Sequence, residues 1–276
     1  QLEKLLGTML NEMSNPLSVS LLYFPILRQD LGPLSPWGNF VRKRQQVDQI
    51  LYDEIAERRS HPDAAGNDIL TLLMSARDEA GEAMTDVELR DELMTLLFAG
   101  HETTATALTW ALYWIHKFPK VRDRLLQELQ ELDDPLDPSV LSRLPYLNAV
   151  CCETLRIYPV GMLTFPRIVR LPVEVMGHLL EPGTIVIGSI YLSHRREDVY
   201  PDPEHFSPER FLDRQFSPFE YLPFGGGSRR CIGMAFAQFE MKVVLSRILS
   251  QVELVTDTRS ARPVRRGLTS GISPIK

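Results

Sequence analysis

One helical pattern constrains this chain more than any other feature of its sequence. Thr85 and Glu88 have the spacing of a capping box, so a helix is expected to begin there. Its apolar residues recur as far as Phe118, and Pro119 ends the pattern. A helix over about residues 86–118 would be roughly 50 Å long, which is enough to cross a whole domain. We therefore expect a mainly helical fold arranged around this central helix.

Shorter patterns predict the elements on either side. Helical periodicity predicts further helices at about residues 37–59, 69–76, 121–132, 146–158 and 232–250. Strand patterns are present at 173–175, at 184–192 and in the tail 252–276. A turn at Pro182–Gly183 should join the first two strands, and residues 194–223 should form an ordered loop region. The expected class is mainly α with small β-sheets (α+β).

The charge and the cysteine count exclude several classes of protein. A net charge of −6 gives no basis for nucleic-acid binding. Three cysteines cannot close a disulfide framework, so we expect a reducing compartment and a cytoplasmic protein; Cys151 and Cys152 should be buried and inert. No stretch of about 18 uncharged apolar residues is present, and any N-terminal anchor is expected outside this chain. The apolar stretch 21–27 is compatible with peripheral membrane contact or with covering a substrate entrance.

The middle of the long helix carries residues that are unusual in a buried helix. The stretch 93–99 is apolar on nearly all sides and should be buried. Gly100 costs about 1 kcal/mol relative to alanine, and an unpaired Glu102 carboxylate would be expensive to bury. Two interpretations remain open. Glu102 and Thr103 form a proton-delivery site beside a groove opened by Ala99 and Gly100, or these residues form a solvent-facing polar stripe.

Two acid–base clusters lie further along the chain. Glu153 and Arg156 are three residues apart, share a helix face and can pair. Arg210, within the segment Pro208–Phe211, could join them in a buried network. Such networks set the register of packed elements more than they add stability, so we expect a structural role for both clusters.

Cys231 stands at the start of the helix expected over 232–250. A helix N-terminus and the two preceding arginines favour the thiolate form of its side chain. The glycines at 225–227 and Gly233 allow the backbone to turn tightly and to approach a large flat group. No Lys-Ser or Lys-Thr pair follows, which argues against a phosphate loop, and no second pair of cysteines provides a zinc site. A single thiolate indicates haem iron; the alternative is an inert buried cysteine.

Together these features resemble the cytochrome P450 family. The segment FGGGSRRCIG at 224–233 resembles its haem-binding loop, with an aromatic, a glycine, a basic residue and a second glycine at the family's positions around the cysteine. Residues 99–104 resemble its oxygen-activation motif, Glu153–Arg156 its Glu-x-x-Arg motif, and Pro208–Phe211 the segment that completes a Glu–Arg–Arg triad. The resemblance covers essentially all of residues 1–276 as a single domain. It implies the P450 fold, incomplete at the N-terminus.

The resemblance also implies a role for each site residue. The residues it assigns to haem b (iron protoporphyrin IX) are Cys231 as axial thiolate and metal ligand, Phe224 beneath the porphyrin, Arg229 and Arg167 at the propionates, and Gly227 and Gly233 in the loop. The residues it assigns to oxygen activation are Thr103 and Glu102, which relay protons, and Ala99 and Gly100, which leave space for dioxygen.

The implied activity is that of a haem-thiolate monooxygenase, an oxidoreductase. It would insert one oxygen atom from O2 into a lipophilic organic substrate, by hydroxylation or epoxidation, using two electrons from an external ferredoxin or flavoprotein reductase. Candidate pocket walls are Phe98, 161–164 and 269–272, for which core packing is the alternative. The basic residues that could contact an acidic electron donor are Lys117, Lys120, Arg122, Arg124 and Arg230. The alternative is that they form a solvated helix surface.

Two other functions remain open from the sequence. The first is a haem-thiolate isomerase or dehydratase that acts on peroxides without O2; such proteins tend to lack an acid–threonine pair, so Glu102 and Thr103 argue against it. The second is a haem-free truncated fragment without enzymatic activity, which the absence of the family's N-terminal part from these residues leaves open; the intact Cys231 motif argues only against a catalytically silent haem-binding protein. Dependence of turnover on an electron donor and the binding of haem would distinguish the three.

Overall fold

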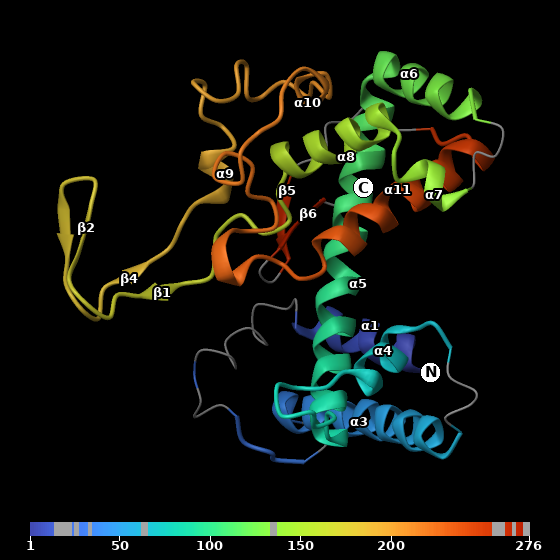
Figure 1. The fold of residues 1–276 in the computed structure, drawn as a ribbon, viewed down its shortest axis with the longest axis vertical. Coiled ribbons are helices and arrows are strands. Elements are labelled where there is room, and N and C mark those ends of the chain that lie inside the picture. The colour runs from blue at the N-terminus through green and yellow to red at the C-terminus, as the bar shows by residue number, and fades with distance from the viewer. Residues whose placement is uncertain are drawn as a thin grey trace. The chain divides into compact units, whose positions relative to one another are not determined.

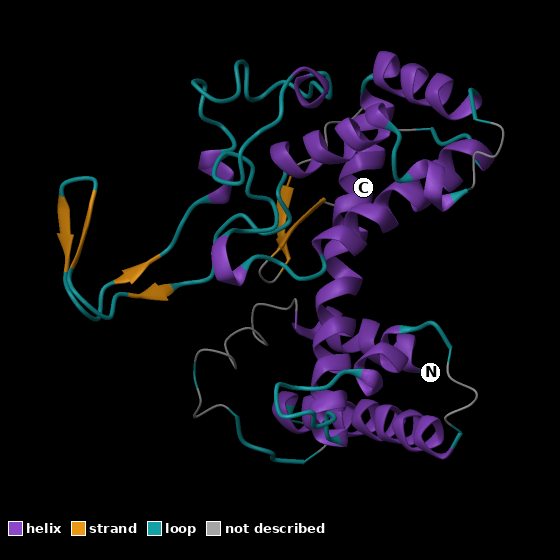
Figure 2. Ribbon diagram, in the orientation of Figure 1, coloured by secondary structure: helices purple, strands orange, loops and turns teal. Residues whose placement is uncertain are grey.

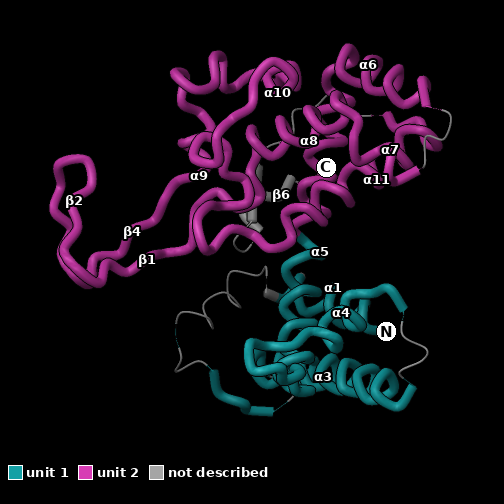
Figure 3. The backbone as a smooth tube through the Cα atoms, in the orientation of Figure 1, with its two compact units in different colours: residues 1–102 teal, residues 103–276 magenta. Residues whose placement is uncertain are grey.

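The computed structural model describes residues 1–13, 24, 28–32, 35–61, 66–132, 137–255, 263–266 and 269–272. The described chain is mainly helical with small two-stranded sheets, as the sequence predicts (Figures 1 and 2). It divides into two compact units, residues 1–102 and 103–276 (Figure 3). The predicted central helix is α5 (Asp86–Lys117), which contributes its first part to unit 1 and its second part to unit 2.

Unit 1 is a small group of helices. Its helices are α1 (Leu2–Met13), α3 (Pro36–Ser60), α4 (Ile69–Ser75) and the first part of α5. Local chemistry explains where the last of these begins, because the Thr85 backbone N–H donates to Glu88 Oε2 at 2.8 Å and the Glu88 N–H donates to Thr85 Oγ1 at 3.3 Å. The predicted capping box is therefore present. The predicted helices at 37–59 and 69–76 are also confirmed, as α3 and α4.

The core of unit 1 corrects one expectation about α5. Leu93, Leu97 and Phe98 pack against an apolar cluster that includes Met9 of α1 and Val47 of α3. These α5 side chains are only half-buried, and Thr95 and Ala99 in the same stretch are exposed. The prediction that the stretch 93–99 is buried is therefore wrong. Only one face of this stretch packs against α1 and α3.

Unit 2 contains the remaining helices. They are the second part of α5, α6 (Pro119–Gln130), α7 (Pro138–Leu141), α8 (Pro145–Ile157), α9 (Ile190–Ser193), α10 (Arg210–Asp213), the 3₁₀ turn η3 (Gly227–Arg229) and α11 (Met234–Gln251). The predictions at 121–132, 146–158 and 232–250 correspond to α6, α8 and α11. Helix α6 begins earlier than expected, because Pro119 occupies its first turn, where the missing N–H costs nothing.

Helix α8 is the most enclosed element of unit 2. From Leu147 to Ile157 every residue except Asn148 is buried. The helix contacts α6, α10 and α11 (Figure 1). Its N-terminus is held by Glu128 of α6, whose two carboxylate oxygens accept the backbone N–H groups of Tyr146 and Leu147, each at 2.8 Å. This enclosure fixes the position of the side chains that α8 presents to its neighbours.

The sheets are short antiparallel pairs. The pairs are β1 (Arg167–Ile168) with β4 (Ile185–Val186), β2 (Val173–Val175) with β3 (His178–Leu180), and β5 (Pro263–Arg266) with β6 (Thr269–Ile272). The predicted turn at Pro182–Gly183 is present, with Gly183 at φ 91°. However, it leads into β4, and β2 pairs instead with β3 through Met176 and Gly177, whose φ angles are 51° and 81°.

The predicted strand over 184–192 is largely wrong. Only Ile185–Val186 is a strand, and α9 follows it. The reason is local, because the Ser189 hydroxyl accepts the Leu192 N–H at 3.2 Å and begins a helical turn. The expected strands in the tail are confirmed as β5 and β6. Except for Phe24, the stretch 21–27 lies outside the described residues, and within the described ranges no helix has both the length and the apolar character needed to cross a membrane.

Candidate active site

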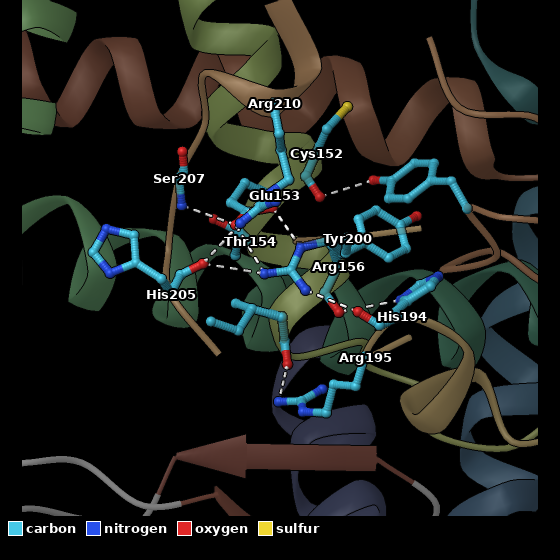
Figure 4. Close-up of polar contacts among 12 residues, drawn as sticks. Cys152, Glu153, Thr154, Arg156, His194, Arg195, Tyr200, His205, Ser207 and Arg210 are labelled. Atoms are coloured by element: carbon cyan, nitrogen blue, oxygen red, sulfur yellow. Dashed lines mark hydrogen bonds and ion pairs between the residues drawn. The ribbon is translucent and has the colours of Figure 1, made fainter. Parts of the chain in front are cut away.

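A buried carboxylate on α8 organises the polar interior of unit 2 (Figure 4). Arg156 donates to Glu153 twice, from Nε to Oε2 at 2.6 Å and from Nη2 to Oε1 at 2.9 Å, and both side chains are fully buried. Glu153 Oε1 also accepts the Ser207 backbone N–H at 2.9 Å and Arg210 Nε at 3.2 Å. The structure therefore brings together Glu153, Arg156 and Arg210, the three residues that the sequence suggested as a buried network.

The two guanidinium groups extend this network to the loop after α9. Arg156 donates to the His194 carbonyl oxygen at 2.9 Å and to that of His205 at 3.3 Å. Arg210 donates to the carbonyl oxygens of Pro201 at 3.0 Å and His205 at 3.3 Å. A segment with little regular structure is thus held in place by side chains of α8 and α10. Pairing and hydrogen bonding together make the burial of these charges tolerable.

His194 joins this network to the loop before Cys231, although it lies in none of the motifs found in the sequence. Its side chain is fully buried. Its Nδ1 lies 3.1 Å from the Arg156 carbonyl oxygen, and its Nε2 accepts the Leu222 backbone N–H at 2.8 Å. Burial lowers the pKa of His194 to about 4; the contact with the Arg156 carbonyl opposes this shift, and the charges of Arg156 and Arg195 add to it.

The loop over 224–233 has the backbone that its glycines predicted. Gly225 and Gly227 have φ angles of 72° and 64°, a region that other residues rarely adopt. Gly226 lies so close to Leu222 that an added Cβ would approach the Leu222 side chain to 3.2 Å. The loop closes where the Cys231 N–H donates to the Phe224 carbonyl oxygen at 2.9 Å. The glycines thus allow a compact turn that ends at the cysteine.

Cys231 is exposed, whereas Cys151 and Cys152 are buried. Burial raises the pKa of the Cys151 and Cys152 thiols, which agrees with the expectation that they are inert. Helix α11 begins at Met234 with Gly233 as its N-cap residue, so Cys231 stands just before it. The alternative of an inert, buried Cys231 does not hold in this structure.

The side chains around Cys231 fit a haem group. Among the described residues, no group of three His, Cys, Asp or Glu side chains is placed to hold a metal ion, so the donor set at this loop is a single thiol. Ile232, the next residue, and Phe236 in the first turn of α11 are 92% and 60% exposed, so apolar surface follows the cysteine directly in the chain. One sulfur ligand on a glycine turn, next to apolar side chains, suits a large flat macrocycle held by one axial thiolate.

The other predicted haem residues lie on or near this loop. Phe224 is half-buried and packs against the main core of unit 2. Arg229 is exposed within η3, and an added Cβ on Gly233 would lie 3.8 Å from Cys231 Sγ. Arg167 is on β1, exposed, and donates to the carbonyl oxygens of Phe165 and Pro166 at 3.2 Å each. One loop therefore gathers all of the predicted haem residues except Arg167.

The predicted oxygen-activation residues lie on consecutive turns of α5. Ala99 and Gly100 are exposed, and an added Cβ on Gly100 would meet no atom within 4 Å. Glu102 and Thr103 are half-buried. Neither a fully solvated polar stripe nor a dry interior describes these positions. Ala99, Gly100 and Glu102 belong to unit 1, and Thr103 is the first residue of unit 2.

The candidate docking residues divide into two groups. Arg124 pairs with Glu209 at 2.9 Å, with its guanidinium 4.1 Å from the centroid of the Tyr146 ring. Arg122 pairs with Asp123 at 3.1 Å, and Lys117 donates to the Tyr113 hydroxyl at 3.0 Å. The two remaining residues, Lys120 and Arg230, are exposed.

The candidate pocket walls lie on different elements. Phe98 packs with the α1 and α3 cluster in unit 1. Leu163 is 59% exposed and forms an isolated bridge with Ser189. Residues 269–272 form β6, one of the strands expected in the tail.

The comparisons with known proteins agree with one another. A model of the family described as "Cytochrome P450" matches residues 1–275. "Putative cytochrome P450 135B1" of Mycobacterium tuberculosis (strain ATCC 25618 / H37Rv) is 45% identical over 227 residues, covering 81% of this chain and 47% of the relative. "Putative cytochrome P450 135A1" of the same strain is 38% identical over 243 residues, covering 87% and 52%. The chain spans about half the length of the curated relatives it matches.

Solved structures show the same fold. The structure described as "Retinoic acid bound cyanobacterial CYP120A1" is 31% identical, with a TM-score of 0.79, over 87% of this chain and 56% of that chain. The structure described as "Crystal structure of cytochrome P450DA heme domain" is 25% identical, with a TM-score of 0.85, over 98% and 59%.

Proposed function

The chain belongs to the cytochrome P450 family, and from that premise we propose that it carries the thiolate-bearing part of a haem-thiolate monooxygenase. Members of this family bind haem b. The observation that carries the proposal is Cys231, an exposed thiol on a glycine turn beside apolar side chains. When bound, haem supplies the redox chemistry with which O2 is activated. The chain itself supplies the ligand, the surroundings of the ligand and the protons.

The haem-binding roles follow from the loop. Cys231, which stands just before α11, would hold the haem iron through its sulfur. Gly227 takes a positive φ within the turn, Gly233 keeps the backbone beside the sulfur free of a side chain, and Phe224 anchors the loop to the core. Arg229 and Arg167 are exposed cations suited to two propionates.

The proton-delivery roles fall to adjacent residues of α5. Glu102 and Thr103 are consecutive and half-buried, so a carboxylate within reach of water and a hydroxyl able to hold a proton occupy adjacent positions of α5. Ala99 and Gly100 add little bulk one turn earlier, and Gly100 faces open space. In this proposal residues 1–276 act as one domain, with α5 contributing to both units.

The substrate is a lipophilic organic molecule, and the electrons come from an external ferredoxin or flavoprotein reductase. The structural relative at 31% identity is described as bound to retinoic acid, a lipophilic acid, which supports this substrate class. Exposed Lys120 and Arg230 are candidate contacts for an acidic electron donor. Arg122 and Arg124, engaged with acidic side chains, are weaker candidates.

Isotope incorporation tests the reaction. The haem-loaded protein, supplied with a reductase and NADPH, is incubated with a panel of lipophilic acids under ¹⁸O2. The expected result is one labelled oxygen atom per product molecule. Thr103→Ala should lower product formed per NADPH consumed by roughly 10²-fold, because the relayed proton is lost while electron entry continues. Conversion of a hydroperoxide without any electron donor, and without such labelling, would support the isomerase or dehydratase instead.

A further inference from the structure

His194 lies in none of the motifs described above. Its backbone carbonyl and both of its ring nitrogens nevertheless make hydrogen bonds. Its backbone carbonyl accepts Arg156 Nη1, and its two ring nitrogens contact the Arg156 carbonyl and the Leu222 amide. The ring stacks on Tyr221 with centroids 5.6 Å apart and meets Tyr200 edge-on at 6.1 Å. A fully buried histidine with this many directed contacts holds elements together through specific atoms as well as through its volume.

The contacts determine which ring nitrogen carries the proton. The Leu222 N–H can only donate, so Nε2 must be unprotonated and accept this bond. The Arg156 carbonyl can only accept, so Nδ1 must carry the proton and donate it. The imidazole is therefore neutral and in a single tautomer. The charged groups that face it, Arg156 and Arg195, are both cationic and disfavour a second proton.

The bond to Leu222 places the first turn of the cysteine loop. The Leu222 carbonyl accepts the Gly225 N–H at 2.9 Å, and the Phe224 carbonyl accepts the Cys231 N–H at 2.9 Å. The preceding residue, Tyr221, donates its hydroxyl to the Cys152 carbonyl of α8 at 3.0 Å. Tyr221 is thus bonded to α8 directly, and Leu222 is bonded to it through His194. The loop from Leu222 to Cys231 is short and closed by its own backbone hydrogen bonds.

We propose that His194 is a positioning residue that fixes the start of the Cys231 loop relative to α8. Because His194 is bonded to Arg156, the rigid Glu153–Arg156–Arg210 network then also fixes the position of the thiolate. The hydrogen-bond relay stands on the geometry alone; its consequence for the thiolate rests on the proposed function. A histidine that merely filled space beside Tyr221 would not need a fixed tautomer or an acceptor aimed at Leu222.

Three substitutions separate these roles. His194→Gln can place an amide oxygen near the Nε2 position and keep an acceptor for Leu222. His194→Asn can reach only the Nδ1 position, so it keeps the bond to Arg156 and loses the other. His194→Phe keeps the ring and its stacking on Tyr221 but loses both bonds. The glutamine variant is thus the conservative rescue, and the phenylalanine variant is the control for volume.

Hydrogen exchange of the Leu222 amide tests the relay in the full-length protein without any assay of turnover. We expect slow exchange in the wild type and in His194→Gln, and exchange at least 10-fold faster in His194→Asn and His194→Phe. Equal protection in all four proteins would overturn the proposal. For the wild type alone, ¹⁵N NMR with labelled histidine should show a neutral ring protonated at Nδ1. A ring protonated at Nε2, or at both nitrogens at neutral pH, would overturn it without relying on a variant that folds.

The carbon-monoxide difference spectrum of the reduced, haem-loaded protein tests the consequence. His194→Gln should keep the red-shifted thiolate band, while His194→Asn and His194→Phe should convert at least half of it to the band of neutral-thiol ligation. An unchanged thiolate band in His194→Phe would contradict the positioning role. Absence of a thiolate band in the wild type would instead remove the proposed function, and the exchange and NMR results would still decide the hydrogen-bond relay.

Discussion

The Glu153–Arg156 pair and the Cys231 loop lie in the same unit of the protein and differ in how their side chains are satisfied. Glu153 and Arg156 are fully buried, and their polar atoms are bonded to other groups of the chain. The Cys231 loop is closed by backbone hydrogen bonds, while Cys231 and Ile232 point to solvent. The polar groups of the first region are therefore occupied by contacts within the chain. In the second region the Cys231 side chain is accessible to another molecule.

This difference in burial predicts different consequences for substitutions in the two regions. Changes in the buried pair should lower the free energy of unfolding, because a charge would be left unpaired in a dry environment. Changes in the loop should leave that free energy nearly unchanged and alter ligand binding, since exposed side chains contribute little to stability. The following predictions test this division.

The largest effect is expected for Glu153→Gln. The substitution keeps the size of the side chain but removes the charge that compensates Arg156, so we expect the free energy of unfolding to fall by about 3–5 kcal/mol. Urea denaturation followed by circular dichroism measures this change. Glu204→Gln is the matched control, because Glu204 pairs with Arg195 at 2.7 Å but is 69% exposed, and it should cost less than about 1 kcal/mol. Equal losses in the two variants would show that burial of the Glu153–Arg156 pair does not determine its contribution to stability.

A smaller, pH-dependent effect is expected from His194. Its pKa is about 4 in the folded protein, against an ordinary value of 6.5. Between these values the unfolded chain binds more protons than the folded one. The contribution of His194 to the free energy of unfolding is therefore fully present above about pH 6.5 and is lost as the pH falls toward 4. The full loss is about 3 kcal/mol, at about 1.36 kcal/mol for each pKa unit.

The measurement is the free energy of unfolding from pH 7 to pH 4 in the wild type and in His194→Gln. Other groups titrate in this range, so the difference between the two curves isolates the contribution of His194. We expect the variant to lose less stability than the wild type on acidification. Parallel curves would show that His194 is not held neutral by its surroundings.

The smallest effect on stability is expected at Cys231. Cys231→Ala should change the free energy of unfolding by less than about 0.5 kcal/mol, because the side chain is exposed. In the haem-free protein, iodoacetamide should alkylate Cys231 and spare Cys151 and Cys152, whose thiols are buried and have raised pKa values. Mass spectrometry of tryptic peptides identifies the modified cysteine. Alkylation of Cys151 at a similar rate would contradict the contrast between the buried and exposed thiols.

Much of the fold could be predicted because its signals are local. The capping box at Thr85 and Glu88 and the proline at 119 set the bounds of α5 within a few residues. The β2–β3 hairpin could not be predicted in the same way. Its two-residue turn places Met176 at φ 51°, a conformation that methionine rarely adopts and that its sequence does not signal.

The candidate site shows the same limit. The Cys231 loop was identified from contiguous residues, since its glycines and arginines surround the cysteine. His194 was not identified, because its partners lie 38 and 28 residues away, at Arg156 and Leu222. A lone histidine between a strand pattern and a proline-rich loop reads equally well as a surface residue. Tertiary packing, which the sequence pattern does not reveal, gives it a specific environment.

The carbon-monoxide difference spectrum of the reduced protein tests whether Cys231 is the thiolate ligand of haem. The spectrum is recorded for the wild type, Cys231→Ala and Cys151→Ala, each loaded with haem. We predict a strongly red-shifted Soret band in the wild type and in Cys151→Ala, and its loss in Cys231→Ala. A thiolate band that survives in Cys231→Ala, or that is absent from the haem-loaded wild type, would contradict this account.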